Sequence, residues 1–254
     1  MILGIDVGNT QTVLGLFEGD DLGGHWRIAT DASMTADELR VKTSGLLDLA
    51  GVSFAQVERV VLSSVVPALT EQYEAMAERA TGRPAMVVGP GIKTGMPIKY
   101  DDPREVGADR IVNAVAAIEA YGAPVIVVDF GTATTFDVVD AAGAYVGGAI
   151  APGVETSAEA LFSRAARLAK VDLEPPARAI GRNTTESVQA GLLLGEAAMV
   201  DGLVRRIRAE LGVPARVVAT GGLASRMAPL CETIETVDPD LTLRGLLVLY
   251  RRNA

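Results

Sequence analysis

The 254-residue sequence contains one cysteine and one histidine, and each shortage excludes a kind of chemistry. Cys231 cannot form a disulfide within the chain, which fits a reducing compartment, and we expect it to be a small buried apolar side chain. His25, next to Trp26, lies in no catalytic motif, which argues against a Ser-His-Asp triad or a multi-histidine zinc site and predicts a structural role. Any chemistry therefore depends on carboxylates, on arginine and lysine, and on backbone amides.

Aromatic residues and long apolar runs are also scarce. Only 4% of the residues are aromatic although 49% are hydrophobic, which predicts an aliphatic core. No stretch approaches the roughly 20 uninterrupted apolar residues of a membrane helix, and no basic segment precedes the first apolar run, so we expect neither a membrane span nor a signal peptide. A formal net charge of −9 argues against a nucleic-acid or anionic-membrane surface. These features predict a soluble, cytoplasmic protein.

The common phosphate-binding and catalytic motifs are missing. The segment most similar to a P-loop, Gly89-Pro-Gly-Ile-Lys93-Thr94, lacks the glycine before the lysine and has the wrong spacing. No Gly-x-Gly-x-x-Gly opens a helix after a strand, which argues against a dinucleotide-dependent oxidoreductase. A protein-kinase His-Arg-Asp loop and a Gly-x-Ser-x-Gly elbow are absent as well. If the chain binds nucleotide phosphates, it uses another kind of loop.

What the sequence does contain is a polar turn between two apolar strands at its start. Ile2–Ile5 ends in Asp6, the turn Gly8-Asn9-Thr10 follows, and a second apolar run covers Val13–Phe17. Glycine allows the backbone to approach a ligand closely, and successive N–H groups can point at one anion. An ordinary hairpin would show the same residues. Residues 127–136 (Val-Val-Asp-Phe-Gly-Thr-Ala-Thr-Thr-Phe) repeat the pattern, however, and two such turns suggest a duplicated fold that binds one nucleotide.

The remaining elements support two similar halves, which we place at residues 1–118 and 119–254. In each half, three strands in a meander precede alternating helices and strands, the pattern βββαβαβα. The first half is predicted to have strands at 2–5, 13–17, 22–30, 57–66 and 84–89 and helices at 35–50, 67–80 and 108–121. The second is predicted to have strands at 125–129, 134–140, 145–150, 215–220 and 234–237 and helices at 154–169, 184–211, after Gly221-Gly222 and at 240–252.

Residues at the helix ends fix several of these boundaries. Thr35-Ala-Asp-Glu38 is a capping box, Pro67 suits the first position of a helix, and Gly82 suits a helix stop. The segment 89–102 is rich in glycine and proline and predicts an irregular loop, and a loop of this length is usually functional or mobile.

Three carboxylates, two at strand ends and one at the start of a helix, suggest that the protein catalyses phosphoryl transfer. That reaction needs cations for the phosphates, donors around the moving phosphoryl group and a base that orients the attacking hydroxyl. Asp6 and Asp129, each followed by a glycine turn with hydroxyls, suit metal and phosphate binding, because Mg²⁺ prefers hard oxygen ligands. A helix N-terminus would keep Asp109 ionised and able to accept a hydrogen bond, and Arg110 beside it could bind an anion. Alternatively, Asp6 and Asp129 simply end strands and Asp109 only complements a helix dipole.

Together these motifs resemble those of type III pantothenate kinases, members of the acetate-and-sugar-kinase/Hsp70/actin superfamily. The first motif alone is specific only to the superfamily, whereas the set of three is specific to the family. The three motifs are Asp6-Val-Gly-Asn-Thr10, Gly107-Ala-Asp-Arg110 and Asp129-Phe-Gly-Thr-Ala-Thr134, and the resemblance extends to Ser63-Ser-Val-Val-Pro67, Gly181-Arg-Asn-Thr184 and Thr220-Gly-Gly-Leu-Ala224.

The resemblance implies an α/β fold, the duplicated ribonuclease H-like (actin-like ATPase) fold with two similar halves around a nucleotide cleft. It implies ATP-dependent phosphorylation of pantothenate to 4'-phosphopantothenate at the primary hydroxyl, the first step of coenzyme A biosynthesis. The implied cofactors are Mg²⁺ with ATP and a monovalent cation, K⁺ or NH₄⁺. The implied assembly is a homodimer with the substrate site at its interface, and no nucleic-acid or membrane partner is expected.

Carried over by position, the resemblance assigns a role to each motif residue. Asp109 would be the general base, Asp129 would hold the monovalent cation and Asp6 would serve Mg²⁺. The ATP-binding residues would be Asp6, Val7, Gly8, Asn9, Thr10, Gln11, Thr12, Val13 and Thr132. The pantothenate-binding residues would be Tyr100, Gly107, Ala108, Asp109, Arg110 and, across the dimer interface, Thr184 or its neighbour Thr185.

Two other functions are compatible with parts of the sequence. Another kinase of the superfamily, acting on a sugar or on acetate, would carry substrate motifs that this chain lacks. A nucleotide-responsive regulator without turnover is the second alternative, because some relatives were first described as accessory factors for transcription. The acidic composition and the lack of a DNA-binding motif argue against direct DNA contact. The presence of Asp109 argues for activity, because a chain without catalytic function would be free to lose its base.

Overall fold

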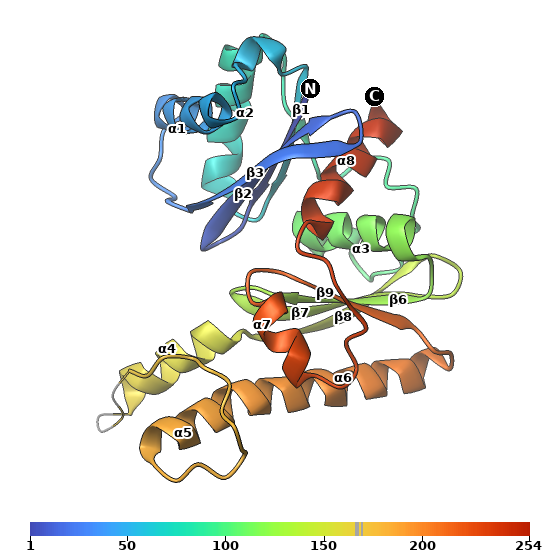
Figure 1. Cartoon of the computed structure of the whole chain (residues 1–254). Coiled ribbons are helices and arrows are strands. Elements are labelled where there is room, and N and C mark those ends of the chain that lie inside the picture. Colours follow the sequence, from blue (N-terminus) through green and yellow to red (C-terminus); the bar gives the residue numbers. More distant parts are fainter. Residues whose placement is uncertain (166–167, 169) are drawn as a thin grey trace. The chain divides into compact units, whose positions relative to one another are not determined.

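A computed structural model describes residues 1–165, 168 and 170–254 (Figure 1). The chain divides into two compact units, each with its own hydrophobic core. The first unit consists of Met1–Glu119 together with Asp240–Ala254, and the second consists of Ala120–Pro239. The halves predicted from the sequence, 1–118 and 119–254, therefore differ from the compact units in where the last segment belongs. A helical pattern in a sequence does not reveal which sheet the helix covers.

A five-stranded mixed sheet in the order β3-β2-β1-β4-β5 forms the centre of the first unit. Its strands are β1 (Ile2–Val7), β2 (Gln11–Glu18), β3 (Asp21–Ala29), β4 (Arg59–Ser64) and β5 (Met86–Val87). The meander of β1, β2 and β3 is antiparallel, whereas β4 runs parallel to β1 and β5 parallel to β4. The carboxyl ends of β1 and β4 consequently lie at the same edge of the sheet, the edge where open α/β sheets bind ligands.

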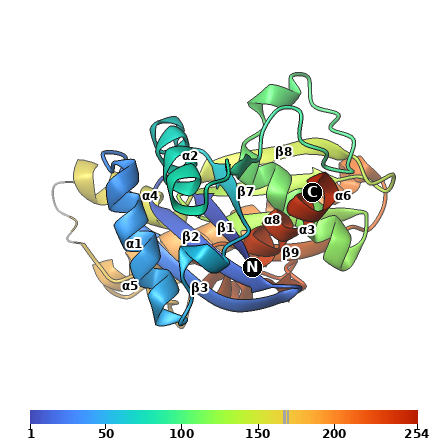
Figure 2. The same cartoon turned by 90° about the horizontal axis from the view of Figure 1, so that it is seen from above.

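Two helices pack on one face of this sheet (Figure 2), and their ends lie within one residue of the predicted ones. They are α1 (Ala36–Leu49) and α2 (Pro67–Thr81). The Thr35 backbone N–H donates to the Glu38 carboxylate at 2.9 Å, and the Thr35 hydroxyl accepts from the Glu38 N–H, which completes the capping box. Gly82 ends α2 with a φ of 71°, a conformation that glycine adopts at low cost. Local sequence signals therefore sufficed for both helices.

The opposite face of the first sheet is covered by α8 (Leu241–Asn253), which packs on β1, β2 and β4. Glycines make room for this helix. A Cβ on Gly4 would lie 3.3 Å from Leu246, and a Cβ on Gly15 would lie 2.8 Å from Leu243. The first unit also contains all but the last two residues of α3 (Ala108–Tyr121) and two 3-10 turns, Phe54–Gln56 and Pro103–Glu105.

The second unit repeats this plan. Its sheet has the order β8-β7-β6-β9-β10, with an antiparallel meander followed by two parallel strands, which is the order of the first sheet. The strands are β6 (Val125–Phe130), β7 (Ala133–Val139), β8 (Tyr145–Pro152), β9 (Arg216–Thr220) and β10 (Thr236–Val237). The duplication predicted from the two polar turns is thus present in the sheet topology.

The helices of the second unit depart from the prediction in two places. They are α4 (Val154–Arg164), α5 (Thr184–Gln189), α6 (Gly195–Leu211), which lies along the sheet in Figure 1, and α7 (Ala224–Met227), followed by a 3-10 turn at Ala228–Leu230. Helix α4 ends before the predicted residue 169, although residues 166, 167 and 169 lie outside the described part of the chain. A π-helical turn, Ala190–Leu194, joins α5 to α6 and was not predicted.

In the described part of the chain, one helical segment, Thr184–Leu211, is long and apolar enough to cross a membrane by length and composition alone. Val200 and Val204 of this segment are fully buried in the core of the second unit. Its Asp201 accepts hydrogen bonds from the N–H groups of Glu232 and Thr233, both at 2.9 Å. Core helices of globular proteins pass the same test, so this segment is weak evidence for a membrane span.

The lone cysteine and the lone histidine occupy unremarkable positions. Cys231 is a free thiol, half-buried against the core of the second unit, and burial together with nearby Asp201 and Glu196 raises its pKa to about 12. Such a thiol is unreactive at neutral pH, in line with the expected packing role. His25 is exposed on β3, beside Trp26, which packs against the first core.

Candidate functional site

The first polar turn connects β1 to β2 in the first unit. Asp6 is half-buried near the end of β1, opposite Val13 on β2 and Ser63 on β4. The Gly8 N–H donates to the Gln11 carbonyl at 3.0 Å, and a Cβ on Gly8 would lie 2.9 Å from that oxygen. Glycine is therefore required for the close approach that narrows this turn.

Thr30, at the end of β3, fixes the same turn. Its hydroxyl donates to the Gly8 carbonyl at 2.8 Å and lies 2.9 Å from the Thr12 hydroxyl. Its backbone N–H donates to the Thr10 carbonyl at 2.9 Å. The tip of the turn, Asn9–Gln11, is exposed. The turn is thus braced from the third strand while its tip is accessible to a ligand. Sequence reasoning missed Thr30, since nothing local marks a threonine whose partners lie about twenty residues earlier.

The end of β4 lies beside the turn. The Val65 N–H donates to the Val7 carbonyl at 3.0 Å, which extends the pairing of β1 and β4. Ser63 is fully buried, and its hydroxyl is the one buried side-chain group without a hydrogen-bond partner in the described part of the chain. It stands in register with Asp6 on the neighbouring strand β1. Ser63 was recognised only as part of a motif, without a role.

The Gly107-Ala-Asp-Arg110 motif forms the N-terminus of α3, as predicted. The Gly107 carbonyl accepts the first helical hydrogen bond, from the Ile111 N–H at 3.2 Å. The Asp109 carboxylate bends back and accepts from the Arg110 N–H at 2.8 Å, and a Cβ on Gly107 would lie 2.5 Å from Asp109 Oδ1. Glycine at position 107 therefore leaves room for this carboxylate conformation.

The motif combines a perturbed carboxylate with a buried cation. Burial raises the pKa of Asp109 above its usual range, and the Arg110 N–H and guanidinium oppose this only in part. Arg110 itself is only 7% exposed. A carboxylate that is costly to ionise, next to an arginine, is the electrostatic pattern of a catalytic base beside an anion-binding group.

A cavity of about 570 Å³ in the first unit adjoins this motif. Gly107 and Ala108 line it together with Ser64 and Val65 from the end of β4. The other lining residues are mostly apolar: Val88, Gly89, Pro90, Gly91, Ile92, Thr94, Ile98, Pro103, Arg104, Glu105, Val106 and Ile111. Tyr100 lies half-buried in the preceding loop and is not among the lining residues. The cavity is thus a mostly apolar pocket, open to solvent, with the start of α3 on its wall.

The second polar turn, in the second unit, matches the first. Asp129 is half-buried near the end of β6, opposite Thr135 on β7 and Thr220 on β9. Asp6 has the same position in the first sheet, between residues of β2 and β4. The Gly131 N–H donates to the Ala133 carbonyl at 3.1 Å. Gly221 has a φ of +93°, and a Cβ there would overlap Asp129 Oδ1 and the Phe130 backbone.

Thr132 and Thr134 of this turn have different surroundings. The Thr132 residue is exposed, and its carbonyl accepts from the Gly153 N–H at 3.1 Å and from the Thr156 hydroxyl at 2.7 Å. The Thr134 hydroxyl donates to Glu196 at 2.5 Å. Burial raises the pKa of Glu196, which sits on α6 directly after the π-helical turn. Sequence reasoning missed Glu196, because a glutamate inside a helical pattern is ordinarily solvated.

Around these turns the available ligands are oxygens. No group of three or more His, Cys, Asp or Glu side chains that could hold a metal ion occurs among the residues that the structure describes. A preformed protein cage for a transition metal is therefore not found there. A single carboxylate with backbone carbonyls and hydroxyls nearby, as at Asp129, suits a hard cation with weak geometric demands.

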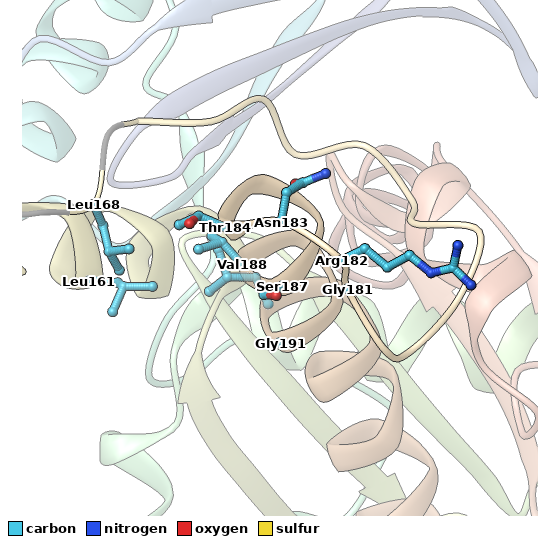
Figure 3. Close-up of a pocket in the computed structure, with 10 residues that line it drawn as sticks. Leu161, Leu168, Gly181, Arg182, Asn183, Thr184, Ser187, Val188 and Gly191 are labelled. Atoms are coloured by element: carbon cyan, nitrogen blue, oxygen red, sulfur yellow. The ribbon is translucent and has the colours of Figure 1, made fainter.

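Thr184 borders a second cavity, of about 690 Å³, in the second unit (Figure 3). Thr184 is exposed at the start of α5, and Leu161 and Leu168 line the cavity with it, while the Arg182 side chain extends away from these leucines. Glu186 organises this segment, since its carboxylate accepts from the Arg182 N–H at 2.8 Å and from the Asn183 amide at 3.0 Å.

The predicted site residues are divided between the two units. Asp6–Val13, Tyr100 and Gly107–Arg110 belong to the first unit, whereas Asp129, Thr132 and Thr184 belong to the second. Within the first unit, the end of β4 links the Asp6 turn to the cavity beside the start of α3, because Ser63 pairs with Asp6 and the next two residues line the cavity.

Two sheets of identical order, each with an Asp-x-Gly turn after its first strand, define the class of protein. Solved structures with this fold include the ROK hexokinase from Thermus thermophilus, with a TM-score of 0.52 at 17% identity, covering 100% of this chain and 99% of that chain. Another is component A of the (R)-2-hydroxyglutaryl-CoA dehydratase from Acidaminococcus fermentans, with a TM-score of 0.61 at 16% identity, covering 100% and 99%. The chain has the same fold as these structures, which confirms the expected fold class, an α/β fold with two similar halves.

The family follows from the sequence over most of its length. The family model for type III pantothenate kinase matches residues 2–206. Relatives named type III pantothenate kinase include that of Moorella thermoacetica, 52% identical over 253 residues and 100% of both chains. That of Syntrophotalea carbinolica is 54% identical over 100% of this chain and 99% of the relative. The chain belongs to the type III pantothenate kinase family and is a kinase, as its three motifs predicted.

Proposed function

We propose that this kinase phosphorylates pantothenate with ATP, giving 4'-phosphopantothenate and ADP in the first step of coenzyme A biosynthesis. The family and its relatives at 52–54% identity support the reaction. The observation that carries it is Asp109 at the N-terminus of α3: a half-buried carboxylate with a raised pKa, next to Arg110. It belongs to the motif whose first two residues, Gly107 and Ala108, line the cavity of about 570 Å³.

In the proposed reaction Asp109 is the general base. Its carboxylate accepts the proton of the primary hydroxyl while the hydroxyl oxygen bonds to the γ-phosphorus and the bond from that phosphorus to the bridging oxygen of ADP breaks. A base with a raised pKa takes up this proton more readily than an ordinary aspartate does. The proton then leaves Asp109 for solvent, which restores the carboxylate.

The same region suits the rest of the substrate. Pantothenate carries an apolar dimethyl-substituted segment next to the reacting hydroxyl, which matches the apolar lining of the cavity. It also carries a carboxylate, and Arg110 would bind either that group or the phosphoryl group in transfer. We assign substrate binding to Gly107–Arg110 and Tyr100 and, from the partner protomer of a homodimer, to Thr184, which is exposed beside its own cavity. Thr185 is the alternative for the last contact.

ATP binding is assigned to Asp6–Val13 and to Thr132. The braced turn after β1 contains Gly8 and has an exposed tip at residues 9–11, which suits contact with phosphate oxygens. Asp6 offers a hard oxygen to the Mg²⁺ that accompanies ATP, and an ion that retains waters and substrate phosphates needs few protein ligands. When bound, Mg²⁺ neutralises charge on the phosphates.

We assign the monovalent cation, K⁺ or NH₄⁺, to Asp129. The carboxylate lies under the Gly131 turn and against Gly221, where no side chain intervenes. Such a cation would supply positive charge near the phosphates without proton transfer. We further propose a cytoplasmic homodimer, and we retain residues 1–118 and 119–254 as the two duplicated halves, a division by ancestry rather than by compactness.

An assay of ADP release tests this function. Wild type is expected to turn over only when pantothenate and K⁺ or NH₄⁺ are both present. Asp109→Asn should lower kcat on the order of 10²-fold or more, the contribution of a positioned base. Asp48→Asn, at an exposed aspartate of α1, is the matched control and should leave kcat unchanged. Turnover without pantothenate, turnover with glucose or acetate instead, or full activity of Asp109→Asn would contradict the proposal.

A further inference from the structure

The loop between β5 and the Pro103–Glu105 turn forms a large part of the wall of the first-unit cavity. Five consecutive residues, Val88–Ile92, line it, as do Thr94 and Ile98. The loop contains no helix or strand. A loop without regular structure loses conformational entropy when it orders around a ligand, and affinity rises when the loop is ordered beforehand. Whatever fixes this loop in the free protein therefore contributes to binding in the cavity.

The last turn of α8 fixes the middle of this loop. The Asn253 side chain accepts from the Lys93 N–H at 2.9 Å and donates to the Lys93 carbonyl at 3.0 Å, so that one amide group pairs with both backbone groups of one residue. The same amide also donates to the Leu249 carbonyl at 2.8 Å, which orients it on the helix.

Arg252 adds a second attachment one residue earlier. Its guanidinium donates to the Thr94 carbonyl and, at 2.7 Å, to the Glu119 carboxylate at the end of α3. Gly95 allows this approach, because its φ of +67° suits glycine and a Cβ there would lie 2.8 Å from Arg252 Nη1. The arginine thus ties the loop both to α8 and to the helix whose first turn carries Asp109.

We propose that Arg252 and Asn253 are positioning residues of the substrate cavity: they hold Lys93–Gly95 from the end of α8 and so keep the cavity wall in its binding conformation. The identity of the substrate, pantothenate, rests on the proposed function. The proposal places a determinant of substrate affinity at the end of α8, far in sequence from every motif of the family.

Asn253→Ala and Arg252→Ala test this. Each removes hydrogen bonds to the loop, and we expect KM for pantothenate to rise about tenfold in the Asn253→Ala enzyme, while kcat and KM for ATP stay within about twofold. Hydrogen exchange of the substrate-free proteins, followed by mass spectrometry, should be faster over residues 89–99 in each variant than in the wild type. Arg251→Ala is the matched control, because Arg251 pairs with Asp20 and the Gly19 carbonyl at the β2–β3 turn and should change neither quantity.

Three outcomes would overturn the proposal. Unchanged exchange of residues 89–99 in the variants would show that Arg252 and Asn253 do not order the loop. Faster exchange with an unchanged KM for pantothenate would show that loop order is irrelevant to binding. An equal rise in KM in Arg251→Ala would indicate a general effect of α8. A wild type without pantothenate turnover would contradict the proposed function instead. The substrate-free exchange data distinguish that failure from a failure of Arg252 and Asn253 to order the loop.

Discussion

At the scale of single residues, Asp109 is where function and stability oppose each other. Its carboxylate accepts a hydrogen bond from the Arg110 N–H and lies beside Arg110, yet burial still dominates and raises its pKa. A buried group that resists ionisation lowers the stability of the folded protein whenever the pH forces it to be charged. A structural carboxylate would be expected in a better solvated place.

This opposition predicts that Asp109→Asn is more stable than wild type. Folding raises the pKa of Asp109, so between its unfolded and folded pKa values the folded state binds more protons than the unfolded state. The contribution of Asp109 to the free energy of unfolding therefore falls as the pH rises through that window. The free-energy cost of ionising Asp109 in the folded protein is fully present at pH values above this window and absent below it. Urea unfolding from about pH 8 to about pH 4 should show an advantage of the variant at high pH that shrinks toward low pH.

The control for this prediction is the exposed Asp48→Asn, which should show no pH-dependent advantage of that kind. A lower midpoint for Asp109→Asn at neutral pH would mean that the carboxylate stabilises the fold, and a purely structural role would then be the better account of Asp109.

Residue-scale prediction from the sequence succeeded where a motif is contiguous and failed where it is not. Gly107-Ala-Asp-Arg110 could be placed at a helix start because its glycine, aspartate and arginine are adjacent. Thr30 braces the Asp6 turn from another strand, and Glu196 reaches Thr134 from a distant helix, so neither has a local signal. Ser63 could be read as a strand residue, but its unpartnered hydroxyl is visible only in the folded sheet.

At the scale of elements, the sequence predicted most helices and strands because their ends carry specific residues. The capping box of α1 and Gly82 after α2 are examples. The π-helical turn at Ala190–Leu194 has no such signal, since its residues suit an α-helix equally well. Strand β5 is shorter than the predicted 84–89 because pairing with β4, not propensity, sets its length.

The packing of α8 on α3 gives a prediction at this scale. A Cβ on Gly245 would overlap the Val112 carbonyl and lie 2.6 Å from Val112 Cγ1, so Gly245→Ala should force the helices apart and destabilise the protein by about 1–3 kcal/mol. Gly45→Ala, at an exposed helical glycine of α1 with no atom within 4 Å, should instead stabilise by about 0.5–1 kcal/mol. Urea unfolding of both variants measures the difference. Equal changes in stability in the two variants would show that α8 and α3 have room for a methyl group at Gly245.

At the scale of the whole molecule, duplication and compactness divide the chain differently. The two sheets repeat one strand order, so the sequence pattern correctly indicated two similar halves. The final helix of the second half nevertheless packs on the sheet of the first half, through the space left by Gly4 and Gly15. The chain therefore enters the second unit after Glu119 and returns to the first at Asp240. Only the folded structure could reveal this return.

This division predicts which segments open together. Leu62 and Ile126 are fully buried in the first and second cores, and replacing either by alanine costs about 2–5 kcal/mol. If the compact units are cooperative units, Leu62→Ala should speed hydrogen exchange in β1, β4 and α8, whereas Ile126→Ala should speed it in β6, β9 and α6 and leave α8 protected. Mass spectrometry of the two variants decides this. Exchange of α8 that follows Ile126→Ala, or that responds equally to both substitutions, would show that the last helix does not belong to the first unit energetically, whatever its contacts.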